Sequence, residues 1–169
     1  MGRAQAAESI LAGYDTFAEY FKIRAVDAVA VGQITSGDRL PALLVAAGLL
    51  GLRTASLTHH ALVPDRALRR RAAEVLATEG LDAPDALGLL SRFGGFEIGA
   101  MTGVFLAAAR YGTLGVVDGF ASAVAATLAV HLCPAARDAL IVSHTTGTPM
   151  HRRLLEHLRM TPLMGYTVR

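Results

Sequence analysis

Hydrophobic residues follow two different patterns along this chain, one typical of helices and one typical of buried strands. In residues 4–21 the apolar side chains return every three or four positions, which predicts an amphipathic helix. Residues 25–34 are rich in valine and alanine and reach a glycine, as a buried strand does where it enters a loop. The same reasoning predicts strands at 114–120 and 138–144, helices at 36–51, 64–80, 82–93, 121–132 and 148–159, and one helix that ends near residue 110.

Capping residues mark where several of these helices begin and end. Ser36 or Asp38 offers a side-chain oxygen as the N-cap of one helix, and Pro64 and Asp65 stand at the start of the next. Gly51 and Gly80 follow the last periodic positions of the same two helices, as C-terminal glycines do.

The predicted strands are separated by helices and are too far apart in the sequence to form hairpins. Such an order implies a parallel sheet joined by right-handed crossovers. The fold class predicted is therefore α/β, with three layers: a mostly parallel sheet and helices on both of its faces. A length of 169 residues is that of one domain, so 1–169 is expected to form a single unit.

A high apolar content makes a membrane protein the first alternative to consider. Hydrophobic residues make up 53% of the chain, and the mean hydropathy is +0.42. However, the apolar run 40–52 is shorter than the ~20 residues of a spanning helix, and the run 114–132 is interrupted by an Asp-Gly pair. No cationic and then apolar leader opens the chain, and a single cysteine allows no internal disulfide. These features predict a cytoplasmic protein without a membrane segment.

The charge of the chain argues against nucleic acid as a partner. Although the isoelectric point is about 9.0, the net charge is only +2, aromatic residues make up 6%, and tryptophan is absent. Base stacking therefore has few candidate side chains.

Small polar residues follow each of the three predicted strands, in 32–38, 117–122 and 142–149. Ligands of open parallel sheets gather at the carboxyl ends of the strands. Glycines and hydroxyls at the start of a helix leave backbone N–H groups within reach of a phosphate. None of the three segments is a Walker loop or a GxGxxG motif, so this signal for phosphate is general.

Two acidic residues near predicted helix starts each allow two interpretations. Asp118 either accepts hydrogen bonds from a sugar hydroxyl or caps the helix that begins near Ala121. Glu97 either lines a ligand site or only interacts with the helix dipole, which is worth about 0.3–1 kcal/mol. Taken alone, Glu97 fits the second interpretation.

The segment SRFGGFEIGAMTG, residues 91–103, raises a related question. Small residues recur at every fourth position, at Gly95, Gly99, Gly103 and Ala107. They fit either a ligand loop that opens a helix or a helix thin enough to pack closely on a neighbour.

The histidines do not form a recognisable metal motif. His59 and His60 are adjacent and would point apart in a helix, while His144 and His151 are separated by a Gly/Pro break and lack a third ligand at a suitable spacing. The sequence predicts neither a metal site nor a cofactor.

Three segments taken together resemble a known family. GGFEIGAM, VVDGFASAVAATLAVHLCPAARDALIVSH and PMHRRLLEHLRMTPLM are similar, in order and spacing, to the C-terminal half of the nicotinate-nucleotide:dimethylbenzimidazole phosphoribosyltransferases. The similarity runs from about Leu89 to Leu163. It implies a Rossmann-like three-layer fold that transfers phosphoribose from nicotinate mononucleotide to dimethylbenzimidazole and makes α-ribazole phosphate, a precursor of cobalamin.

The resemblance also implies a set of substrate-binding positions. They are Gly32, Gln33, Gly37, Arg70, Gly95, Glu97, Asp118, Ser143 and His144. Arg70 takes the place of a phosphate-contacting lysine, with Arg71 as the alternative register. Arg39 could partly replace the hydroxyls that the family carries at the end of its phosphate loop.

Some family features are changed. In SHTTGTPMH, Thr148 stands where the family has an acid and Met150 where it has a glycine. The family's general base is a glutamate in an L-G-E-G stretch that follows a segment similar to PLMGYTVR, and residues 1–169 do not include it. The expectation is a fragment, a split subunit or a decayed homologue, which associates as a homodimer or with a complementary chain. No catalytic residue is assigned within the sequence.

Overall fold

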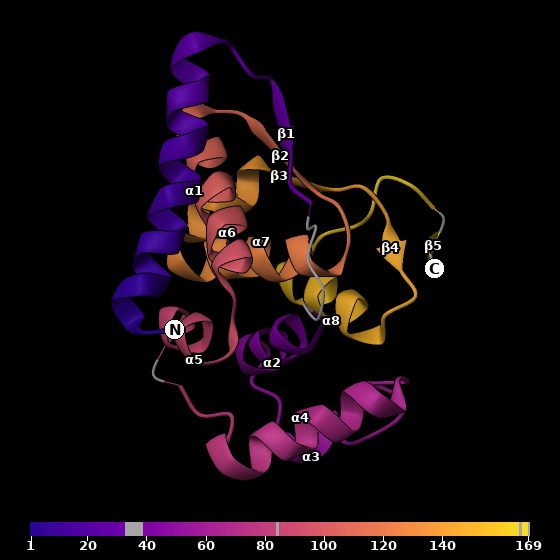
Figure 1. Ribbon diagram of the computed structural model, residues 1–169. Coiled ribbons are helices and arrows are strands. Elements are labelled where there is room, and N and C mark those ends of the chain that lie inside the picture. The colour runs from indigo at the N-terminus through magenta and orange to yellow at the C-terminus, as the bar shows by residue number, and fades with distance from the viewer. Residues whose placement is uncertain (33–38, 84, 166, 169) are drawn as a thin grey trace.

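The computed structural model describes residues 1–32, 39–83, 85–165 and 167–168 (Figure 1). The helices are α1 (Arg3–Ile23), α2 (Arg39–Leu49), α3 (Thr54–Leu57), α4 (Arg66–Glu79), α5 (Ala86–Phe93), α6 (Phe96–Tyr111), α7 (Phe120–Leu132), the 3-10 helix η1 (Pro134–Ala139) and α8 (Pro149–Leu158). The strands are β1 (Ala28–Ala30), β2 (Leu114–Val117), β3 (Leu140–Val142), β4 (Thr145–Thr146) and β5 (Thr167–Val168).

The three strands predicted from the sequence form one parallel sheet in the order β1-β2-β3. Val29 lies opposite Gly115, and Gly115 lies opposite Leu140. All three strands are shorter than predicted. The start of the predicted strand 138–144 is wrong, because η1 occupies that stretch up to Ala139. β4 and β5 form a separate parallel pair.

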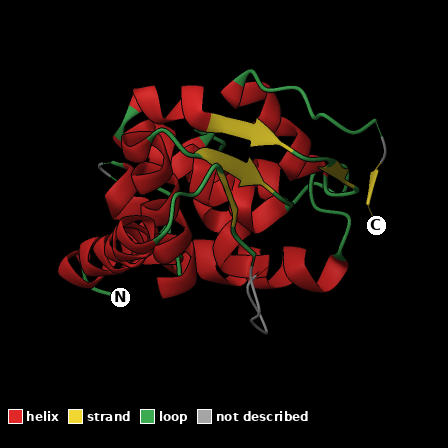
Figure 2. Ribbon diagram, turned by 90° about the horizontal axis from the view of Figure 1, so that it is seen from above, coloured by secondary structure: helices red, strands yellow, loops and turns green. Residues whose placement is uncertain are grey.

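Helices α6 and α7 lie against one face of the sheet. Val117 and Val142 point to that face and are buried, while their neighbours Val116 and Ile141 are only partly buried. Seen from above, the strands lie in front of the helices (Figure 2). The α/β class and the parallel sheet are confirmed. Helices over the second face stay a prediction, because the described helices leave its apolar residues partly open to solvent.

Helices α1 and α6 run alongside one another and touch through small residues (Figure 1). A Cβ added to Gly99 would lie 1.9 Å from Ser9 Oγ, and a Cβ added to Gly103 would lie 1.9 Å from the Ile10 carbonyl oxygen. On the other helix, a Cβ on Gly13 would lie 1.9 Å from the Ala100 carbonyl oxygen. The stripe of small residues is therefore the close-packing face of α6.

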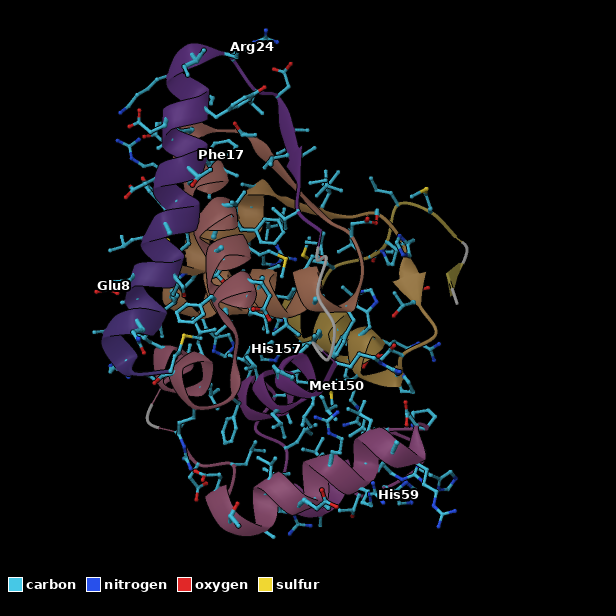
Figure 3. The ribbon with its side chains drawn as sticks, in the orientation of Figure 1. Glu8, Phe17, Arg24, His59, Met150 and His157 are labelled. Carbon is cyan, nitrogen blue, oxygen red and sulfur yellow. The ribbon has the colours of Figure 1, made fainter. Side chains whose placement is uncertain are left out.

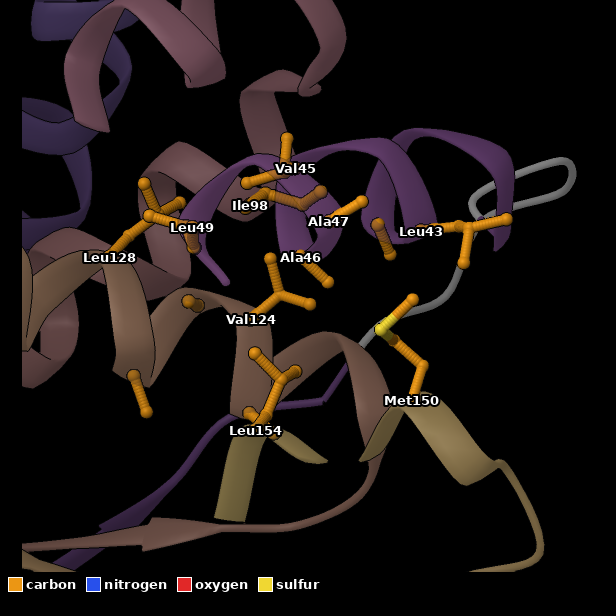
Figure 4. Packing of buried hydrophobic residues seen from close by; sticks show 14 of the residues in the cluster. Leu43, Val45, Ala46, Ala47, Leu49, Ile98, Val124, Leu128, Met150 and Leu154 are labelled. Carbon is orange, nitrogen blue, oxygen red and sulfur yellow. The ribbon is translucent and has the colours of Figure 1, made fainter. Parts of the chain in front are cut away.

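The apolar run 40–52 forms a core helix. α2 is buried nearly all round, and it packs chiefly against α5 and α7, with further contacts to α4 and α8 (Figure 4). Ala46 and Ala47 belong to the same hydrophobic cluster as Ile98, Val124 and Leu154 (Figure 4). Among the described residues, no helix has both the length and the apolar character that crossing a membrane requires.

The predicted ends of α4 are confirmed, and Asp65 proves to be its N-cap. The Asp65 side chain accepts hydrogen bonds from the backbone N–H groups of Ala67 and Leu68, at 2.9 and 3.0 Å. These bonds, the one from Leu68 above all, lower the pKa of the Asp65 carboxyl. Gly80 ends the helix with a φ of 65°, a conformation that favours glycine. The predicted capping residues Ser36 and Asp38 lie outside the described residues.

Candidate functional site

Three of the predicted site residues meet at the carboxyl edge of the sheet. Asp118 follows β2, while Ser143 and His144 follow β3. Val117 lies opposite Val142 in the parallel register, so the residues after each strand emerge side by side. Ser143 Oγ donates a hydrogen bond to Asp118 Oδ1 at 2.9 Å, and His144 Nδ1 lies 3.2 Å from the same oxygen. We call these three residues the strand-end cluster.

The Asp118 carboxylate belongs to this cluster and does not cap α7. The N-cap position of α7 is Gly119, with a φ of 99° and no side-chain capping bond. The Asp118 backbone N–H donates instead to Ser122 Oγ at 2.8 Å, which fixes the turn. Because the Asp118 side chain is 54% exposed, it keeps lone pairs free for hydroxyl groups of a ligand.

A cleft of about 400 Å³ opens at the same edge of the sheet. Helices α2, α4, α7 and α8 all begin at its rim, and their positive dipole ends face this region. Leu43 and Met150 lie close to one another in its apolar wall (Figure 4). The other lining residues are Arg39, Leu62, Val63, Pro64, Asp65, Leu68, Phe120, Thr146, Gly147, Thr148 and Pro149.

Arg39 places a positive charge on the rim of the cleft. Its Nη1 lies 3.1 Å from Asp65 Oδ2, and its side chain is 63% exposed. An exposed guanidinium held by one carboxylate still has donors for a phosphate. Sequence reasoning assigned Arg39 only a supporting role, although its position in the first turn of a helix after a polar loop is a usable signal.

His151 supports the loop that forms one wall of the cleft. Its Nδ1 accepts a hydrogen bond from the Thr146 backbone N–H at 3.1 Å and lies 3.0 Å from Thr146 Oγ1. The side chain is fully buried, and its Nε2 has no hydrogen-bond partner in the described part of the chain. Burial, with a smaller effect from His144, lowers the pKa of His151 to about 4. A neutral imidazole therefore holds Thr146 in place.

Gly95 and Glu97 lie together at the start of α6. The Glu97 side chain folds back over the turn, because a Cβ on Gly95 would lie 2.2 Å from Glu97 Oε1. Glu97 is also the acid in the first turn of the helix, as expected for an interaction with the dipole. Neither residue lines the cleft.

The remaining predicted positions are dispersed. Gly32 follows β1 and has open space where a Cβ would be. Arg70 lies on the exposed side of α4, pairs with Glu74 at 3.5 Å and does not line the cleft. Gln33 and Gly37 lie outside the described residues.

The histidines do not form a three-ligand metal centre. Among the residues with described positions, no group of three His, Cys, Asp or Glu side chains lies close enough to hold an ion. The sequence analysis expected His59 and His60 to point apart in a helix. They lie instead in a turn after α3, and their rings stack with centroids 4.9 Å apart.

The fold and the cluster define an α/β protein with a polar side-chain cluster beside a largely apolar cleft at the carboxyl ends of parallel strands. A family model described as phosphoribosyltransferase matches residues 1–169. The nicotinate-nucleotide:dimethylbenzimidazole phosphoribosyltransferase of Desulforudis audaxviator is 37% identical over 168 residues, which are 97% of this chain and 47% of that protein. The protein of the same name from Azotobacter vinelandii is 44% identical over 119 residues, which are 70% of this chain and 32% of that protein.

Solved structures agree. The nicotinate-nucleotide:dimethylbenzimidazole phosphoribosyltransferase of Thermus thermophilus superposes with a TM-score of 0.83 at 29% identity, covering 96% of this chain and 48% of that one. The chain therefore belongs to the nicotinate-nucleotide:dimethylbenzimidazole phosphoribosyltransferase family, as its motifs implied. It spans about half the length of the curated relatives it matches.

Proposed function

We propose that this chain binds nicotinate mononucleotide at the strand-end cluster and takes part in phosphoribosyl transfer to dimethylbenzimidazole. The observation that carries the proposal is the meeting of Asp118, Ser143 and His144 beside a cleft, in a chain of this family. Relatives that carry the name of this reaction are about twice as long, so the activity is proposed for the chain rather than transferred to it.

Different parts of the site suit the ribose, the phosphate and the base of the nucleotide. The half-exposed Asp118 carboxylate accepts hydrogen bonds from ribose hydroxyls, while Ser143 and His144 fix its orientation. The phosphate lies among the helix starts, where Arg39 and the backbone of Gly147 are within the same cleft. The apolar wall beside Leu43 and Met150 suits an aromatic base. Glu97 and Arg70 remain proposed contacts at a greater distance from this centre.

The proposed reaction exchanges one bond at the anomeric carbon. The bond to the nicotinate nitrogen breaks, and its electron pair stays with nicotinate. A ring nitrogen of dimethylbenzimidazole forms the new bond, and the other ring nitrogen loses its proton to solvent. The Asp118 carboxylate beside the ribose stabilises the positive charge that develops on the sugar.

The experiment is a product assay with the purified chain. Nicotinate mononucleotide and dimethylbenzimidazole are incubated with it, and nicotinate and α-ribazole phosphate are separated by chromatography. Both products should form in equal amounts, and Asp118→Asn should reduce their rate while Asp138→Asn, at an exposed site, leaves it unchanged. No product despite saturable binding of the nucleotide would assign the chain to the alternative role, a non-catalytic nucleotide-binding subunit. The absence of both nucleotide binding and product would refute the proposal.

We further propose that the chain associates with a second polypeptide, either its own copy or a complementary chain. The outer edge of β1 pairs with no strand in the described ranges, and Leu114 and Ile141 lie on the open face of the sheet. Unpaired edges and exposed apolar faces favour association. Light scattering at several concentrations tests this, and a monomer at every concentration would rule out the homodimer. The small-molecule substrates and the single cysteine fit a cytoplasmic location.

A further inference from the structure

The outer edge of β1 is open in the described part of the chain. No described strand lies beyond β1 in the order β1-β2-β3. Exposed sheet edges are usually protected from pairing by charged side chains, prolines or bulges. β1 consists of Ala28, Val29 and Ala30, so it contains neither a charge nor a proline. This edge is free to accept another strand.

The backbone register shows which groups of β1 face outward. The N–H of Leu114 in β2 donates to the carbonyl oxygen of Asp27 at 2.9 Å, so the Asp27 backbone faces β2. Facing alternates along a parallel ladder, and Val29 therefore also faces β2. The N–H and C=O groups of Ala28 and Ala30 point the other way, to the outer edge, where they are available to a further strand.

A groove of about 890 Å³ runs beside this edge, between β1 and the C-terminal part of α1. Phe17 and Arg24 mark the stretch of α1 that borders it (Figure 3). Val29 lines the groove and packs against the buried cluster that contains Phe17. Two large apolar side chains of α1 also line it, yet Tyr20 is 54% exposed and Ile23 is 78% exposed. A segment laid along the groove would remove this apolar surface from water.

We propose that the outer edge of β1 and this groove receive an extended strand from a complementary polypeptide, the counterpart of the half of its relatives that this chain does not match. The inference rests on the association proposed above and names the partner and its place. The chain covers 47% of the Desulforudis audaxviator relative and 48% of the Thermus thermophilus structure. In each of those proteins both halves belong to one polypeptide, so the partner is expected to be about as long as this chain.

The geometry defines the chemistry of the incoming strand. Its backbone binds the outward groups of Ala28 and Ala30, as in β-strand addition. Every second side chain of a strand points to the same face, so alternate residues lie over the groove, on the same side as Val29. These residues are expected to be apolar, because they meet Tyr20 and Ile23 there. A second copy of this chain fits less well, since its β1 has one large side chain, Val29, which already packs within its own chain.

The test is co-expression of this chain with the half of the Desulforudis audaxviator relative that it does not match, with an affinity tag on that half only. Wild-type chain and one variant are expressed together, so that they compete for the partner, and mass spectrometry of the purified complex gives their ratio. Ile23→Lys should be depleted at least tenfold, because it places a charge in the groove. The matched control is Leu11→Lys, which should be retained equally. Leu11 lies on the same helix, is 57% exposed and does not line the groove.

The edge itself is tested by two substitutions at one position. Ala28→Pro removes an outward N–H without removing a bond to β2, as proline at a sheet edge does, and it should be depleted at least tenfold. Ala28→Val keeps the N–H and suits a strand, so it should be retained. Thermal unfolding of each variant checks its fold. If Ala28→Pro unfolds, hydrogen exchange replaces it, because the Ala28 and Ala30 amides should exchange at least tenfold more slowly in the wild-type complex.

Three results would overturn the proposal. The first is the absence of a complex. The second is full retention of Ile23→Lys and Ala28→Pro, which would move the association to another surface. The third is equal depletion of the Leu11→Lys and Ala28→Val controls. The nucleotide assay above uses this chain alone, so failure of the proposed reaction is measured separately from failure of this interface.

Discussion

Glycine has opposite roles in the α1–α6 interface and at the carboxyl edge of the sheet. At the interface, a Cβ on Gly99 or Gly103 would overlap the neighbouring helix at 1.9 Å. At the edge of the sheet, a Cβ on Gly32 or Gly147 would meet nothing within 4 Å. The first two glycines allow two helices to touch, whereas the second two have open space beside the backbone. One region is built for packing and the other for access.

The largest expected effect comes from filling the interface. The double variant Gly99→Ala/Gly103→Ala should destabilise the fold by on the order of 4 kcal/mol, from about 2 kcal/mol of overpacking at each position. Alanine's higher helix propensity offsets part of this cost. Denaturant unfolding measures the difference. In the matched variant Gly32→Ala/Gly147→Ala, each substitution should change the free energy of unfolding by no more than ~0.5 kcal/mol. Equal effects of the two double variants would show that the two regions do not differ in this way.

The next largest effect is a loss of stability in acid, which is caused by the buried His151 behind the cleft wall. The pKa of His151 is lowered to about 4 in the folded chain, against about 6.5 in the unfolded chain. Its contribution is complete above pH 6.5 and is lost as the pH falls to 4, because only the unfolded chain takes up the proton in that interval. The loss amounts to up to about 3 kcal/mol.

Denaturant midpoints at intervals from pH 7.5 to pH 4 measure this slope. His151→Gln should flatten it, since glutamine does not titrate and its amide oxygen can still accept from the Thr146 N–H. His60→Gln, in an exposed turn, should keep the wild-type slope. An unchanged slope in His151→Gln would mean that other groups cause the acid sensitivity.

A smaller effect is expected on ligand affinity. Asp118→Asn should weaken binding of nicotinate mononucleotide by about tenfold or more, because a hydrogen bond to a charged group is worth roughly 1.5–3 kcal/mol. Its unfolding temperature should hardly change, since the side chain is half exposed. Calorimetric titration gives the affinity, and Gly103→Ala should show the reverse pattern, with lower stability and nearly unchanged affinity. Parallel losses of stability and affinity in both variants would contradict a division between the two regions.

The smallest effect concerns the ion pair that joins the start of α1 to α5. Arg3 Nη2 lies 2.6 Å from Asp85 Oδ2, and the Arg3 hydrogen bond is the largest cause that lowers the pKa of Asp85 to about 2. The stability that it contributes is present above about pH 4 and is lost as the pH falls toward 2. Arg3→Gln should raise the pKa of Asp85 in an NMR titration. A pKa that stays near 2 would assign the shift to the Gly88 N–H alone.

The sequence predicted most of what depends on local pattern. Helical segments identified both ends of α1, α7 and α8 and the end of α6 to within a few residues, and the start of α4 near Asp65 was correct. The strand-end cluster could also be predicted, because the ends of adjacent parallel strands meet wherever the order of elements is known. Short elements such as α3, η1 and β4 were missed, because they span too few residues to show a period.

Contacts between elements were beyond sequence reasoning. The Arg39 and Asp65 pair and the support of Thr146 by His151 depend on how whole helices pack. Arg70 is a predicted site residue that the packing places away from the cleft. A positive charge at the expected place in the sequence lies on the solvent face of α4, paired with Glu74.

NMR mapping of nicotinate mononucleotide on the labelled chain tests directly whether the strand-end cluster binds the nucleotide. Saturable shifts are expected for the backbone amides of Asp118, Gly119 and Ser143 to Gly147, with the amides of Gly99 and Gly103 unmoved. No saturable shifts, or shifts confined to α1 and α6, would contradict the assignment of the strand-end cluster as the nucleotide site.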